Sequence, residues 1–289
     1  MLCILCYVLV LVVVVQTGLA GRHGSKKRGN KATTQSMPHP APYIPLPQSV
    51  RVANFTREEL DTAKKMSLET EIRMSGPEIA LLMRYISKAN FYFEFGCGGS
   101  TKLVSFYGPP EIYIHSLDSN RDWLLSVANS SFVRTKIEQK KISLQLINLG
   151  AIGDWGYPSV VIPQHHIFPP IKSGMNTGAV ALPPVPQELR GVFATYPNAI
   201  RNITSTINVV LVDGRFRVAC VINAVLAQPN AVILVHDFLE PGHHQFYNVL
   251  LDVMYIQESA DTLVRLRRKA DATDEILQAV LDKNIHIAW

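Results

Sequence analysis

A glycine-rich turn directly after an apolar run is the part of this sequence best suited to chemistry. The run 91–95 contains one acid, Glu94, and three glycines follow it within four positions, at Gly96, Gly98 and Gly99. A backbone without Cβ atoms can approach a ligand closely, and the start of a helix favours anionic groups. We therefore expect a ligand at the end of this run.

Polar or glycine-rich residues follow four further apolar runs in the same way. They are Asp118 after the second run, the loop 150–156 after the third, Asp213 after the fourth, and His236 and Asp237 after the fifth. In an open parallel sheet, ligands bind outside the carboxyl ends of the strands. Carboxylates and a histidine at such ends can orient a reacting hydroxyl or take its proton near neutral pH.

Alternating strand and helix patterns must position these residues. We expect strands at residues 91–95, 111–117, 142–149, 207–212 and 231–235, and two later strands at 253–258 and 262–267. Helical patterns cover residues 57–66, 77–87, 100–106, 121–137, 217–227, about 243–250 and about 273–282. This alternation predicts βαβ units and hence an α/β fold, with a doubly wound, mostly parallel sheet and helices on both faces.

The first 50 residues differ in character from the rest of the chain. Residues 2–15 are almost purely apolar, and the small residues Gly18 and Ala20 follow at the positions that a signal peptidase reads. We therefore predict a signal peptide over residues 1–20, with an uncleaved N-terminal membrane anchor as the alternative. Residues 21–50 are basic and then Pro-rich, which is typical of a linker.

The remaining residues, 51–289, form one predicted domain. A Pro-rich segment at about 157–200 interrupts the alternation and is expected to be an insertion. Three glycosylation sequons begin at Asn54, Asn129 and Asn202. Together with the leader, they predict a protein of the secretory pathway, either secreted or resident in the lumen of the endoplasmic reticulum or Golgi.

The composition is that of a globular protein, because 47% of the residues are hydrophobic and only 18% are charged. The net charge is +5, but the basic clusters are not interleaved with aromatic residues, so we expect no nucleic-acid partner. Beyond the leader the cysteines are Cys97 and Cys220, and a disulfide between them stays open, as does the oligomeric state.

Three ligand classes compete for the glycine-rich turn. A phosphate-binding P-loop has its lysine before Ser or Thr, whereas Lys102 comes after Ser100 and Thr101. The dinucleotide fingerprint has glycine where this chain has Thr101, which also disfavours a nicotinamide-dependent oxidoreductase. An acid on the strand and a second acid, Asp118, one βα unit later suit a ligand with a ribose and a cationic amino-acid tail, without a diphosphate.

At these motifs the chain resembles class I S-adenosylmethionine-dependent methyltransferases, and among them a small O-methyltransferase-like subgroup. Residues 94–100 (Glu-Phe-Gly-Cys-Gly-Gly-Ser) resemble the family's first motif, and Asp118 resembles the acid that closes its second strand. Residues 210–217 and 235–238 resemble its fourth- and fifth-strand motifs. The resemblance covers roughly residues 75–270 and implies a Rossmann-like fold of seven strands, the last one antiparallel, with S-adenosyl-L-methionine as the cofactor.

The resemblance also implies which residues bind the cofactor. They are Glu94, Gly96, Gly98, Gly99, Ser100, Asp118, Asp154 and Trp155. The glycines and Ser100 would line the methionine tail, with Glu94 near its positive charge. Asp118 would accept hydrogen bonds from the ribose. Asp154 and Trp155 would approach the adenine, although a packing role for Trp155 is equally open.

The candidate catalytic residues are Asp213, His236 and Asp237. Methyl transfer requires alignment of donor and acceptor and removal of any acceptor proton. Asp213 would orient the acceptor or act as a base, and His236 would take a hydroxyl proton. Some related O-methyltransferases hold a divalent cation between carboxylates placed like Asp213 and Asp237. Phe238 stands where such sites often have an amide, and it cannot ligate a metal, so we predict none.

The sequence therefore predicts methyl transfer from S-adenosyl-L-methionine to a hydroxyl or carboxylate. The acceptor would be a small molecule, a glycan or a protein of the secretory pathway. The alternative is a non-catalytic binding or scaffold protein that retains the fold.

Overall fold

The computed structural model describes residues 50–153, 158, 187–240 and 244–288. All of these residues belong to one compact unit, residues 40–289. The predicted leader, the linker up to residue 49 and most of the insertion lie outside the described residues, as do Asp154 and Trp155. In the described part of the chain, no helix has both the length and the apolar character needed to span a bilayer.

One seven-stranded sheet organises the fold, with strand order β3-β2-β1-β4-β5-β7-β6. The strands are β1 (Phe91–Phe95), β2 (Tyr113–Asp118), β3 (Ile142–Leu146), β4 (Val209–Val212), β5 (Val232–Val235), β6 (Met254–Ala260) and β7 (Leu263–Arg268). Strands β1 to β5 run parallel, and β7 runs antiparallel to both of its neighbours. The predicted fold class is confirmed. The strand order reverses between β1 and β4, which is where open α/β sheets bind ligands.

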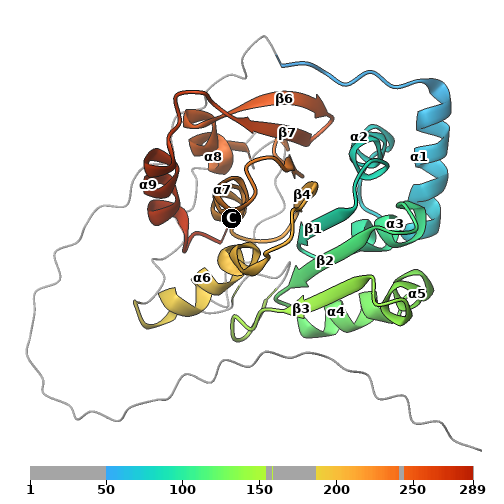
Figure 1. The fold of residues 1–289 in the computed structure, drawn as a ribbon, viewed down its shortest axis with the longest axis horizontal. Helices are drawn as coiled ribbons and strands as arrows, with labels where there is room; N and C mark the ends of the chain where they lie inside the picture. The colour runs from blue at the N-terminus through green and yellow to red at the C-terminus, as the bar shows by residue number, and fades with distance from the viewer. Residues whose placement is uncertain (1–49, 154–157, 159–186, 241–243, 289) are drawn as a thin grey trace, which may run out of the picture. The chain divides into compact units, whose positions relative to one another are not determined.

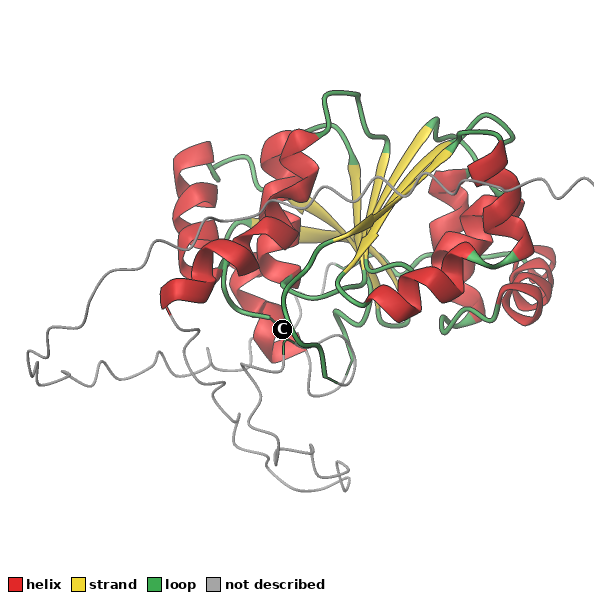
Figure 2. Ribbon diagram, turned by 90° about the horizontal axis from the view of Figure 1, so that it is seen from below, coloured by secondary structure: helices red, strands yellow, loops and turns green. Residues whose placement is uncertain are grey.

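Helices cover both faces of the sheet (Figure 2). One face carries α1 (Arg57–Thr70), α2 (Gly76–Ile86), α3 (Gly99–Tyr107), α4 (Arg121–Ala128) and α5 (Ser131–Glu138). The other carries α6 (Arg190–Asn198), α7 (Arg217–Ala227), α8 (His244–Tyr247) and α9 (Asp274–Asn284). Short 3₁₀ helices lie at Gln187–Leu189, Ala199–Asn202 and Asn248–Asp252. Figure 1 shows the two groups of helices on opposite sides of the strands.

Strand β1 lies at the centre of the sheet, and all five of its residues are buried. Phe91, Phe93 and Phe95 pack into the core formed with α6, α7 and α9. Tyr92 packs into the core formed with α1, α2 and α3. Because strand side chains alternate between faces, Glu94 also points to the α1–α3 face. The sheet thus carries a buried carboxylate on one face, beside the glycine-rich turn.

The structure differs from the sequence-based expectation in two segments. One helix is predicted over residues 121–137, but the helix is interrupted at Asn129 and Ser130. The backbone of Ser130 is extended (φ −60°, ψ 138°), and α5 begins at the next residue. Short polar side chains compete with helical backbone hydrogen bonds at such positions. The predicted insertion, 157–200, contains a helix that the sequence pattern did not indicate, because α6 lies within it and buries Phe193. The two cysteines of the domain are buried and free.

Candidate active site

Two glycines in the turn after β1 are required by packing against the protein's own backbone. Gly96 has φ +93°, and a Cβ on it would lie 2.7 Å from the Cα of Gly214. A Cβ on Gly99 would lie 2.4 Å from the Cα of Ile72. Among the described residues, a Cβ on Gly98 would meet only the side chain of Trp123, at 3.6 Å. Gly98 is therefore the glycine that the fold itself does not require, so it stays the best candidate for close ligand approach.

Glu94 and Ser100, two of the predicted cofactor-binding residues, contact each other in the interior. Glu94 is fully buried, and Ser100 donates to its Oε1. The hydroxyls of Thr101 and Ser116 donate to Oε2, the latter at 2.8 Å. Burial raises the pKa of Glu94 to about 7, against the effect of these three donors. Glu94 therefore stabilises the start of α3 from inside the fold.

The raised pKa of Glu94 predicts a pH dependence of stability. Between its ordinary value of 4.5 and about 7, the folded protein retains a proton on Glu94 that the unfolded chain releases. The free energy of unfolding should therefore fall as pH rises through this window, on the order of 3 kcal/mol in total. Glu94→Gln should remove this dependence, as measured by urea denaturation at about pH 5 and about pH 7. Glu138→Gln, an exposed control on α5, should keep the wild-type slope; an unchanged slope in Glu94→Gln would contradict the assignment.

Asp118 and Trp123 flank the outer side of the glycine-rich turn. Asp118 accepts the N–H of Cys97 at 3.2 Å and that of Asn120 at 2.7 Å. The indole of Trp123 donates to the carbonyl of Cys97 at 2.6 Å, lies against Gly98 and is still 49% exposed. Asp118 itself is partly buried. The turn, an acid and an open aromatic face thus meet at the end of β2.

Trp123 is not among the residues predicted from the sequence, which include Trp155 instead. The feature that could have indicated it is a tryptophan in the first turn of the helix that follows Asp118. Asn120 caps this helix by accepting the N–H of Trp123. The exposed ring next to Gly98 is a second aromatic candidate for contact with an adenine.

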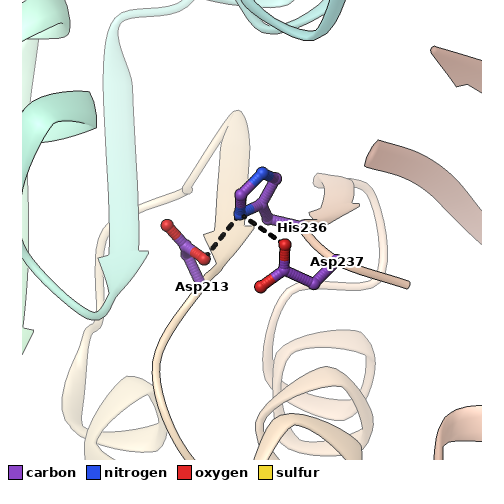
Figure 3. A group of neighbouring side chains, drawn as sticks. All are labelled: Asp213, His236 and Asp237. Atoms are coloured by element: carbon purple, nitrogen blue, oxygen red, sulfur yellow. Dashed lines mark hydrogen bonds and ion pairs between the residues drawn. The ribbon is translucent and has the colours of Figure 1, made fainter. Parts of the chain in front are cut away.

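A second cluster forms at the ends of β4 and β5. The register pairs Leu211 with Leu234, so Asp213 and His236, two residues further on each strand, share the α1–α3 face of the sheet. The Nδ1 atom of His236 lies 2.9 Å from Oδ1 of Asp213 and 3.5 Å from Oδ1 of Asp237. Dashed lines in Figure 3 mark these two contacts. The three predicted catalytic residues therefore lie together.

Arg217, at the start of α7, joins the loops that follow β4 and β5. Its side chain is 3% exposed and donates to the carbonyls of Asp213, Gly214 and His236. Its Nη2 atom also lies 3.0 Å from Oδ2 of Asp237. Asp237 has the left-handed φ of +55°, a strained conformation that such contacts hold in place. Arg217 ends the motif at residues 210–217, but no local pattern in the sequence assigns it a role.

Glu78 reaches the same cluster from α2 and was also missed. Its Oε2 atom lies 3.6 Å from Nε2 of His236, on the side of the ring opposite Asp213. The available signal was an acid at the third position of a helix that begins with the capping box Ser75–Glu78. That pattern predicts a cap and says nothing of a distant histidine.

The charges in this cluster determine the protonation of its members. Burial alone would lower the pKa of His236, but Asp213, Glu78 and Asp237 outweigh it and raise that pKa to about 10. Burial would raise the pKa of Asp213, but His236 and Arg217 outweigh it and hold the pKa lowered. At neutral pH His236 therefore carries both ring protons, which favours Asp213 over His236 as the candidate base. Asp213 is ionised and 28% exposed, so it can accept a hydrogen bond.

No protein-family model and no curated protein matches this sequence. Among solved structures, a methyltransferase-like protein from Silicibacter pomeroyi matches with a TM-score of 0.53 and 19% identity, over 75% of this chain and 97% of that one. The chain has the Rossmann-like methyltransferase fold. A methyltransferase from Geobacter sulfurreducens matches with a TM-score of 0.38 and 11% identity, over 75% of this chain and 91% of that one. The O-methyltransferase TomG from Streptomyces achromogenes, solved with SAM, matches with a TM-score of 0.32 and 14% identity, over 73% of this chain and 88% of that one.

Within this methyltransferase fold, the cluster at β4 and β5 fits a divalent cation poorly. Asp213, His236 and Asp237 do offer ligand atoms within 4.8 Å of one another. However, the guanidinium of Arg217 already lies 3.0 Å from Asp237 and 3.5 Å from Asp213. A cation would have to displace this guanidinium and remove a proton from His236, because a metal binds only the neutral imidazole. Arg217 and His236 already supply the positive charge that two carboxylates require.

Proposed function

We propose that this protein transfers a methyl group from S-adenosyl-L-methionine to a hydroxyl group. One observation carries the proposal: the glycine-rich turn after β1 is in backbone contact with the loop that carries Asp213. A Cβ on Gly96 would lie 2.7 Å from Gly214, directly after Asp213. A donor held at the turn and an acceptor held at Asp213 would therefore be neighbours at the point where the strand order reverses.

The residues around the turn suit the donor. S-adenosyl-L-methionine supplies an electrophilic methyl group on a sulfonium. The backbone at Gly98 is open to close approach, and the partly buried carboxylate of Asp118 at the end of β2 would accept hydrogen bonds from the ribose hydroxyls. The exposed face of Trp123 lies beside Gly98 and offers a surface for stacking. Cofactor contacts thus come from backbone, one carboxylate and one aromatic ring.

The residues at β4 and β5 suit a neutral hydroxyl acceptor better than a carboxylate. His236 and Arg217 keep Asp213 ionised. An acceptor carboxylate would be repelled by the ionised Asp213, whereas a hydroxyl can donate a hydrogen bond to it. The ionised Asp213 can accept the acceptor's O–H and align its oxygen for in-line displacement. Once the methyl group has moved, the resulting oxonium is strongly acidic and can release its proton to Asp213.

The donor site is tested by Asp118→Ala. Loss of a charged acceptor for ribose hydroxyls should weaken binding of S-adenosylhomocysteine by about 10–100-fold. Isothermal titration calorimetry measures this. The control is Asp122→Ala, which removes an exposed acid from the first turn of α4 and should bind as the wild type does. If the wild-type protein produces no heat at high concentration, the proposed donor site is wrong. A scaffold protein would keep its partner binding in Asp118→Ala.

We also propose that the protein enters the secretory pathway, where the acceptor would be a small molecule, a glycan or a protein. The leader over residues 1–20 supports this, and so do the exposed positions of Asn54, Asn129 and Asn202. Expression in secretory cells should give a protein that loses mass on treatment with an N-glycosidase. Replacing all three asparagines with glutamine should abolish that loss, and an unmodified wild-type protein would contradict the route. Mass spectrometry of the N-terminus distinguishes a cleaved signal peptide from a retained anchor.

A further inference from the structure

Glu78 is held in a fixed position by donors from two separate segments. It is 4% exposed, and its Oε2 accepts the N–H of Ser75 at 2.7 Å. Its Oε1 accepts the N–H of Thr262 at 3.0 Å and the hydroxyl of the same residue at 2.5 Å. Thr262 lies in the turn between β6 and β7. Three hydrogen-bond donors therefore fix the direction of this carboxylate. Any fourth partner has to lie where the carboxylate already points.

His236 is that fourth partner, and it connects Glu78 to Asp213. Nε2 of His236 lies 3.6 Å from Oε2 of Glu78, and Nδ1 lies 2.9 Å from Oδ1 of Asp213. The other charged groups facing the ring or its backbone are Asp237, at 3.5 Å from Nδ1, and Arg217, which donates to the carbonyl of His236. A ring with carboxylates at both nitrogens satisfies both only as the doubly protonated imidazolium.

We propose that Glu78 is a positioning residue for methyl transfer: it keeps His236 doubly protonated and oriented, so that Nδ1–H always holds the Asp213 carboxylate toward the acceptor. The inference rests on the proposed function, because Asp213 matters here as the residue that orients the acceptor. Without Glu78, His236 could become neutral, and the neutral ring has two tautomers, only one of which donates from Nδ1. The pKa of Glu78, lowered to about 2 by His236 and the hydrogen bonds against the effect of burial, is consistent with this pairing.

Glu78→Gln tests the proposal, with Glu258→Gln as the matched control. Glu258 is also a buried carboxylate that packs on α2, but its partners are Arg84 and Tyr85. NMR of the histidine ring signals, assigned with His236→Asn, should find His236 protonated from about pH 5 to about pH 9 in the wild type and in Glu258→Gln. In Glu78→Gln the same signals should titrate within this range. A wild-type midpoint near the ordinary value of 6.5 would overturn the proposal even if Glu78→Gln does not fold.

The rate of methyl transfer is the second measurement. In Glu78→Gln, kcat should stay close to the wild-type value at about pH 6 and fall roughly tenfold by about pH 9, while the KM of the donor stays unchanged. If kcat of Glu78→Gln does not change with pH although His236 titrates, Glu78 sets the charge of His236 but does not position Asp213. That result overturns the proposal. The NMR arm needs no cofactor. If S-adenosylhomocysteine does not bind, the proposed function fails and the positioning role fails with it, whereas normal binding with a wild-type-like histidine titration in Glu78→Gln overturns the role alone.

Discussion

Asp213→Asn should lower the rate of methyl transfer by about 10²–10⁴-fold while leaving the affinity for S-adenosylhomocysteine unchanged. The amide keeps the shape of the side chain but removes the negative charge. That charge faces His236 at 2.9 Å and Arg217 at 3.5 Å, and it is the group proposed to hold the acceptor's O–H. The loss falls on kcat because orientation of the acceptor oxygen matters most when the methyl group moves.

The Asp213→Asn experiment needs a check of folding, because two buried cations lose a partner. Breaking such a pair costs about 3–5 kcal/mol in other proteins, so the melting temperature should fall. The rate should therefore be measured well below that temperature, beside Asp271→Asn, an exposed acid that precedes α9. A kcat within twofold of the wild type in a folded Asp213→Asn protein would show that Asp213 does not orient the acceptor. Loss of donor binding would place Asp213 in the cofactor site instead.

Gly96→Ala should destabilise the fold by about 3 kcal/mol or more. Gly96 combines a left-handed φ of +93° with a backbone contact, because its Cβ would lie 2.7 Å from both Cα and N of Gly214. Neither strand can move away easily, since β1 and β4 are hydrogen-bonded neighbours in the centre of the sheet. Urea denaturation should therefore show a lower midpoint, or the protein should fail to accumulate in soluble form.

Two further glycine variants separate packing from ligand binding. Gly191→Ala, within α6, meets nothing within 4 Å in the described structure and should be neutral or stabilising by up to about 1 kcal/mol. Gly98→Ala places its Cβ 3.6 Å from Trp123, an ordinary contact, so the fold should survive while S-adenosylhomocysteine binding weakens at least about tenfold. Normal donor binding by Gly98→Ala would contradict close approach of the ligand to this turn. Wild-type stability of Gly96→Ala would contradict the packing reason for Gly96.

The α/β class, the central strand and the acids at the strand ends can all be predicted from the sequence. β1 spans the predicted residues 91–95, and α7 spans the predicted 217–227. Asp118 closes β2, and Asp213 follows β4. These features are local, because apolar periodicity and the polar residues that end a strand are readable within one segment. The alternation of such segments then restricts the sheet to a few topologies.

The contacts that those residues make depend on the three-dimensional fold. From the sequence, Glu94 is an acid beside a ligand-binding turn, but in the fold Ser116, on the neighbouring strand, donates to it from inside the core. From the sequence, Gly96 leaves space for a ligand, but in the fold it is Gly214, more than a hundred residues away, that leaves no space for a Cβ at this position. From the sequence, His236 is a candidate base, but in the fold Glu78 and Asp213 together favour its doubly protonated form. Charge and burial at a site are sums over groups that the fold brings together from distant parts of the chain, and no local pattern contains that sum.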